Sequence, residues 1–131
     1  KAEQTVVGML NGTKLSFLGY DYPLLAPLLA LRSISVAGMP DIACMKIDAI
    51  ASRGTKRDFI DLFFMTRSIP IGEMVALFKK KYAGITYNLM HIKKSLVYFE
   101  DAESDPMPDM LEAVAWTDVK VFFVEQMQKL V

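Results

Sequence analysis

The sequence predicts an α+β protein in which a small antiparallel sheet precedes a bundle of about five helices. Its 131 residues are 53% hydrophobic and 23% charged, which is enough apolar side chain for one buried core. The early residues alternate as strands do, and from Pro40 onward the apolar residues recur at helical spacing. We therefore expect a sheet part, 1–38, and a helical part, 39–131, that together form one compact domain.

A β-hairpin is expected first. Residues 5–10 are rich in β-formers and end at Asn11-Gly12, the strongest short hairpin signal. Residues 14–20 then alternate with a period of two. Because two strands alone are marginal in water, the hairpin is expected at the edge or end of a larger sheet.

The next segment contains prolines that exclude a long helix. Between Pro23 and Pro27 we expect a turn of helix and a loop. Residues 34–36 are a short strand candidate, closed by Gly38.

The helices follow from caps and apolar stripes. Pro40 suits a first helical position, Gly54 ends the first helix, and Thr55 is a credible N-cap for the second. The expected helices are 40–52, 56–67, one from Pro70 to Tyr82, 88–98, and a last one carrying Trp116, Val119, Phe123 and Leu130. The second is apolar nearly all round, which predicts a central position. The acidic stretch 100–108 is twice interrupted by proline and is expected to be a loop.

Composition excludes several classes of protein. Lys plus Arg number 15, as do Asp plus Glu, so a generic basic coat for nucleic acid is not expected. The single cysteine, Cys44, excludes an internal disulfide framework and fits a reducing compartment, and the single histidine, His91, cannot build a His-rich metal site. No apolar run approaches a membrane span, so a cytoplasmic protein is expected. The first residue is not methionine, which indicates a removed tag or a piece of a longer protein.

The zero net charge hides an asymmetry. Residues 1–99 hold 13 basic and 7 acidic residues, whereas 100–131 hold 2 and 8. One interpretation is a dipolar surface or an intramolecular contact. The other is a basic face kept for phosphate and partly covered by the acidic end.

The densest group of charges lies in the first two helices: Asp41, Lys46, Asp48, Arg53, Lys56, Arg57, Asp58 and Asp61. Asp58 and Asp61 share a helix face, and Arg57 and Asp61, four apart, can pair. One interpretation is a solvated ion-pair network that joins two helices. The other is a polyphosphate site in which Lys46 binds phosphate and the aspartates hold magnesium or orient the cations.

Other candidates are read as structural. Cys44 is expected in the core, His91 at the edge of an apolar stripe, and Lys79–Lys81 at a solvated helix end. The sequence has no P-loop and no GxGxxG, GxSxG or CxxC motif.

Several strings of the sequence carry a family resemblance. They are DIACMKIDAIASRGTKRDFIDLFF at 41–64, LVYFEDAE at 96–103, YDYPLL at 20–25, and the helix containing Trp116. Over about residues 5 to 128 the chain resembles the AbiEii/AbiGii toxin family, which consists of nucleotidyltransferase-like proteins with a DNA-polymerase-β-type fold.

This resemblance implies a transferase that moves a nucleotidyl group from a nucleoside triphosphate with Mg²⁺, as the toxin of a toxin–antitoxin or abortive-infection (phage-defence) pair. Lys46 falls on the family's nucleotide-contacting lysine, and Asp58 and Asp61 fall on the two acids of the following helix. We take Asp58 and Asp61 as candidate catalytic residues and Lys46, Arg53 and Arg57 as candidate nucleotide-binding residues. No residue of the chain is taken as a metal ligand.

The chain also departs from the family. The Gly-Gly-Ser/Thr turn and the Asp-x-Asp pair belong upstream of residue 5 and are absent, and Ser16 stands where a third acid is expected. Two-metal nucleotidyl transfer needs such carboxylates. The chain is therefore expected to be an inactive C-terminal portion whose residues 1–38 are a remnant of the nucleotidyltransferase sheet, with Mg²⁺ a cofactor of the parent enzyme.

Two other functions remain open. The chain could be a non-catalytic interaction module that dimerises or binds an antitoxin through its sheet edge. It could also be a helical RNA binder using a basic face over 41–94, although that face lacks interleaved exposed aromatics. The acceptor of a transferase is equally open among a tRNA end, a protein hydroxyl and a small molecule.

Overall fold

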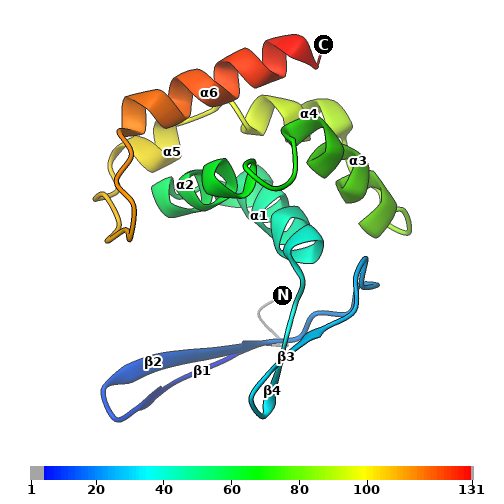
Figure 1. The fold of residues 1–131 in the computed structure, drawn as a ribbon, viewed down its shortest axis with the longest axis vertical. Helices are drawn as coiled ribbons and strands as arrows, with labels where there is room; N and C mark the ends of the chain where they lie inside the picture. Colours follow the sequence, from blue (N-terminus) through cyan, green and yellow to red (C-terminus); the bar gives the residue numbers. More distant parts are fainter. Residues whose placement is uncertain (1–4, 131) are drawn as a thin grey trace.

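The computed structural model describes residues 5–130 and has an α+β architecture with strands first and helices after them (Figure 1). The strands are β1 (Thr5–Leu10), β2 (Thr13–Leu18), β3 (Leu29–Leu31) and β4 (Ile34–Val36). The helices are α1 (Met39–Arg53), α2 (Lys56–Met65), α3 (Ile71–Lys81), α4 (Leu89–Ser95), α5 (Glu100–Glu103) and α6 (Trp116–Lys129). The predicted fold class is confirmed.

The strands form two separate antiparallel hairpins. β1 pairs with β2, and β3 pairs with β4. The first turn has φ of 50° at Asn11 and 79° at Gly12, the left-handed conformations that a two-residue hairpin turn requires. The predicted hairpin and the strand at 34–36 are therefore confirmed, but within residues 5–130 neither sheet has a third strand.

The expected turn of helix between Pro23 and Pro27 is wrong. The segment is irregular and leads directly into β3, which the sequence reading missed. The amides of Leu25 and Ala26 donate to the carboxylate of Asp41. The two amides therefore bond to a side chain and not to backbone carbonyls of a helical turn, and the prolines of the segment disfavour a helix in any case.

α1 is the centre of the helical part, because it packs against α2, α3 and α4, while α6 packs on α2. The prediction that α2 would be the central helix is wrong in this respect, since Phe63 and Phe64 on its second face are only half-buried. Its buried face holds Phe59, whose ring lies 5.1 Å from that of Phe99 and 5.5 Å from that of Phe123.

The stretch 100–108 was expected to be a loop throughout, and its first part is instead the short helix α5. Ala102 is buried in the core, so packing holds this turn in place. Beyond it, Pro106 and Pro108 keep the chain irregular as expected.

The hairpins stand apart from the helices. In Figure 1 the helices occupy the upper part of the molecule and both hairpins lie below them. Among residues 5–130 neither hairpin packs extensively on a helix or on the other hairpin. None of the helices described combines the length and the apolar character needed to cross a bilayer.

Candidate functional site

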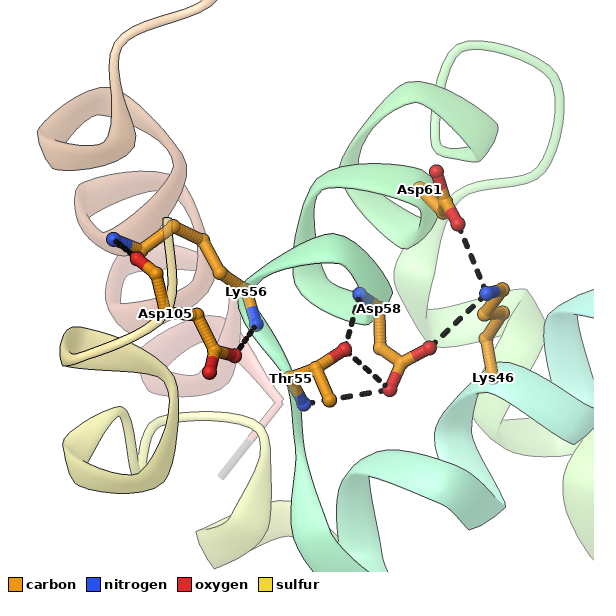
Figure 2. A network of polar contacts seen from close by, with 6 residues as sticks. All are labelled: Lys46, Thr55, Lys56, Asp58, Asp61 and Asp105. Carbon is orange, nitrogen blue, oxygen red and sulfur yellow. Dashed lines mark hydrogen bonds and ion pairs between the residues drawn. The ribbon is translucent and has the colours of Figure 1, made fainter. Parts of the chain in front are cut away.

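Three of the predicted site residues meet in one cluster between α1 and α2. The ammonium of Lys46 lies 3.0 Å from Asp58 Oδ1 and 2.9 Å from Asp61 Oδ2 (Figure 2). The two carboxylates are one helical turn apart on α2, so both reach the same cation on α1. The cluster has a formal charge of −1.

Asp58 is held in place by a second set of contacts. The hydroxyl of Thr55 accepts a hydrogen bond from the amide of Asp58, and the amide of Thr55 donates to Asp58 Oδ2 at 3.3 Å. This reciprocal capping box begins α2 and confirms Thr55 as its N-cap. Asp58 therefore presents one oxygen to the cap and the other to Lys46, as Figure 2 shows.

Lys46 is a permanent cation at neutral pH. Partial burial alone would lower its pKa, but hydrogen bonds from the ammonium to Asp61 and Asp58 outweigh that effect and raise the pKa above its ordinary value. The Lys46 side chain is 25% exposed. It is not suited to act as a general base, and an anion that binds it would have to compete with the two carboxylates for the ammonium.

The two arginines of the predicted site do not join this cluster. Arg53 is exposed in the last turn of α1, and Arg57 is exposed in the first turn of α2. Asp61 pairs with Lys46, so the expected pair between Arg57 and Asp61 is not formed. Within residues 5–130, neither arginine takes part in an ion pair.

Apolar recesses flank Asp61 on two sides. One, of about 450 Å³, runs from Lys46 and Asp61 over Phe64 to Leu29 of β3. The other, of about 460 Å³, lies between α2 and the loop 108–112 and includes Arg57. An apolar recess with a few charges at its rim is the usual form of a small-molecule site, so the first recess could hold a flat ring beside Lys46.

The cluster is not a magnesium site by itself. The part of the chain that the structure describes contains no group of three or more His, Cys, Asp or Glu side chains able to hold a metal ion. Asp58 and Asp61 are both bonded to Lys46. The residues present therefore do not fit Mg²⁺ unless further carboxylates are supplied.

Sequence reasoning missed a buried ion pair. Lys81 was expected at a solvated helix end, but its ammonium lies 2.6 Å from Asp41 Oδ1, and the two side chains are 0% and 1% exposed. A signal was present, because position 81 follows Phe78 by three and lies on the apolar stripe of α3.

The acidic end folds back on the basic body. Lys56 donates its ammonium to the Asp105 carbonyl at 2.7 Å and its amide to Asp105 Oδ2 at 2.9 Å. Arg67 pairs with Glu112 at 2.5 Å. These contacts favour the intramolecular explanation of the charge asymmetry.

The single cysteine, Cys44, and the single histidine, His91, lie outside the Lys46 cluster. Cys44 is fully buried in the core, as expected, and burial raises the pKa of its thiol to about 11. His91 is exposed, and its Nε2 lies 3.1 Å from the carbonyl oxygen of Ala51 in α1.

Comparisons with known proteins give one informative similarity. No family model matches the chain, and no solved structure matches it. The chain is similar to the protein of Aquifex aeolicus (strain VF5) named "Uncharacterized protein aq_aa25", with 40% identity over 133 residues. The match covers 98% of this chain and 63% of that relative, so the chain spans less than two thirds of the relative's length.

Proposed function

We propose that the chain is the C-terminal part of a nucleotidyltransferase-like protein that resembles the AbiEii/AbiGii toxins, and that it carries the second half of the nucleotide site. The observation that supports this best is the bridging of Lys46 by Asp58 and Asp61 at the rim of an apolar recess. All three residues coincide with positions that the family resemblance selects.

Each residue has a distinct proposed role. Lys46 contacts a phosphate of the triphosphate, while Asp58 and Asp61 hold its ammonium in position and the apolar recess receives the base. Arg53 and Arg57, which have no ion-pair partner among residues 5–130, add cationic contacts. By the family resemblance the parent enzyme uses Mg²⁺, and the ligands of that metal would come from elsewhere in the parent, since Asp58 and Asp61 are bonded to Lys46.

The parent would then transfer a nucleotidyl group as a toxin or phage-defence protein, with an antitoxin as its partner. The 131 residues alone would bind triphosphates weakly and show no turnover, because residues 5–130 contain no set of carboxylates able to bridge two metal ions.

Isothermal titration with ATP, CTP, GTP and UTP in the presence of magnesium tests the site. We expect weak binding that Lys46→Ala reduces about tenfold or more, the usual cost of losing a charged hydrogen bond. Lys120→Ala is the matched control, because Lys120 is 27% exposed and also pairs with a carboxylate, Glu103. Binding that survives Lys46→Ala unchanged would show that the site is assigned wrongly.

A second candidate is a non-catalytic interaction module. The exposed apolar side chains of the two hairpins favour it, because such a surface can pair with a second copy or with an antitoxin. Sedimentation of the chain over a range of concentrations tests it, since a module of the self-pairing kind would be dimeric at micromolar concentration.

A further inference from the structure

The first hairpin exposes large apolar side chains on both of its faces. Residues that pair across an antiparallel ladder share a face. One face carries the pairs Val6–Phe17, Gly8–Leu15 and Leu10–Thr13, and the other carries Thr5–Leu18, Val7–Ser16 and Met9–Lys14. Val6 and Phe17 on the first face are each 66% exposed, and Met9 on the second is 68% exposed.

The second hairpin exposes apolar side chains on one of its faces. Leu29 pairs with Val36 and Leu31 pairs with Ile34, so four apolar side chains lie together. Leu29, Leu31 and Ile34 are each 59% exposed. We call the two hairpins, residues 5–18 and 28–36, the hairpin surface.

The hairpin surface is too apolar to be an ordinary solvent face. Isolated soluble proteins rarely expose more than a few hundred Å² of contiguous apolar area, and a two-stranded sheet is marginal in water. The hairpin surface contains two charged residues, Lys14 and Arg32. Its occupant is therefore apolar, because nucleic acid or a charged peptide would find almost no complementary charge.

Exposed apolar side chains on both faces of the first hairpin distinguish between a second copy of the chain and a larger sheet as the occupant. A second copy related by a two-fold axis meets one edge or one face of the first hairpin and leaves the other face in water. Covering both faces needs a layered structure in which elements pack above and below a larger sheet. In addition, more than a third of the Aquifex relative lies outside its match to this chain.

We propose that the hairpin surface is completed within one longer polypeptide, by strands and apolar elements from a segment equivalent to the unmatched part of that relative. The proposal shares with the proposed function the existence of a longer protein, and it does not depend on nucleotide binding. Strands of the segment extend the sheets at their outer edges, and its other elements cover both faces of the first hairpin.

The position of the surface follows from the fold. Leu29 of β3 lines the same recess as Lys46 and Asp61. The chain between the hairpins is tied to the helical part, because Asp41 accepts the amide of Leu25 and Lys81 donates to the carbonyl of Pro23. A segment that covers the hairpin surface would therefore border the Lys46 cluster.

Hydrogen–deuterium exchange, followed by mass spectrometry, tests the proposal on this chain and on the full-length Aquifex relative without nucleotide. In this chain the peptides of 5–18 should exchange within seconds, while those of α1 are slow. In the relative, the matching hairpin should exchange at least about a hundredfold more slowly. Fast exchange of that hairpin in the relative would overturn the proposal, and so would protection in this chain that grows with concentration, which would identify a second copy.

Two variants of the relative test the two-sided coverage. Glutamate is placed at the position matching Val7, on one face, and separately at the position matching Phe17, on the other. Each should make the hairpin exchange at least tenfold faster, whereas glutamate at the position matching the exposed Thr117 of α6 should not. An effect on one face alone would contradict the layered arrangement. Because no nucleotide is present, neither result bears on the test of Lys46.

Discussion

The ammonium of Lys81 lies 2.6 Å from Asp41 Oδ1, and both side chains are closed to solvent. Lys81 also donates to the Pro23 carbonyl at 2.9 Å, and Asp41 accepts the amides of Leu25 and Ala26. The pair therefore joins α1, α3 and the segment that leads to the second hairpin. Because every polar atom in it has a partner, the pair can be buried without an orphaned charge.

Removing the cation should destabilise the protein strongly. In Lys81→Met the methionine fills most of the space of the lysine stem, but Asp41 keeps a buried charge without its counter-ion. Breaking one side of a buried ion pair costs about 3–5 kcal/mol. We expect a loss of this size in the free energy of unfolding, measured by urea denaturation.

The neighbouring Lys80 provides the control, because it carries the same side chain at an exposed position of the same helix. Lys80→Met should change the free energy of unfolding by no more than about 0.5 kcal/mol. Equal effects of the two substitutions would mean that the buried pair contributes no more than a solvated charge.

The same pair should make stability depend on pH in the acid range. Burial alone would raise the pKa of Asp41, but hydrogen bonds from Lys81, Leu25 and Ala26 outweigh it and hold the pKa below its ordinary value. An aspartate in the unfolded chain has a pKa of about 3.9. The contribution of the ionised Asp41 is thus fully present above that pH and is lost as the pH falls through the lower folded-state pKa.

Urea denaturation of the wild type and Lys81→Met at several pH values measures this effect. Asp41 in the variant loses the cation that lowers its pKa, so it should protonate at higher pH. We expect the stability gap between the two proteins to stay constant from about pH 8 to pH 6 and to narrow below about pH 5. A gap that is the same at pH 7 and near pH 3 would exclude Asp41 as the titrating group.

The order of strands and helices could be predicted because local signals and tertiary structure agree. The Asn11-Gly12 turn and the Thr55 cap are encoded within a few residues, and both form as expected. The segment at 23–27 was mispredicted because its hydrogen-bond partner, Asp41, lies in α1, 16 residues after Leu25. Local sequence signals do not report a contact of that separation. α5 was missed for a similar reason, since burial of Ala102 depends on long-range packing.

The site was predictable only in part. Helical spacing places Asp58 and Asp61 on one face, and the structure adds that Lys46 lies between them. Spacing also permitted a pair between Arg57 and Asp61, but Asp61 has the alternative partner Lys46, which is anchored in the core helix α1. Charge type alone cannot distinguish Lys81 from Lys80, because only the direction of each side chain from the helix axis decides which one is buried.

The glycine between α1 and α2 should not tolerate a methyl group. A Cβ at Gly54 would lie 2.8 Å from Cε2 of Phe59, a ring that is fully buried among other aromatic rings. Overpacking of this kind costs about 1–3 kcal/mol. Gly54→Ala should therefore lower the free energy of unfolding by that amount in urea denaturation.

Gly84 is the matched control, because a Cβ there meets no atom within 4 Å. Gly84→Ala should be neutral or stabilise by up to about 1 kcal/mol, since alanine restricts the unfolded chain. If Gly54→Ala were as stable as Gly84→Ala, the close approach of Phe59 would not constrain the connection between the two helices.

The thiol of Cys44 should report on opening of the core. It is fully buried, and burial raises its pKa to about 11, so at about pH 8 roughly one thiol in a thousand is ionised. An aromatic disulfide reagent should therefore react only with molecules in which α1 has separated from its neighbours. The labelling rate should be slow in buffer, rise with urea in step with unfolding, and be higher in Lys81→Met than in Lys80→Met at the same pH. Labelling of the native wild type at the rate of a free thiol would contradict the burial of Cys44.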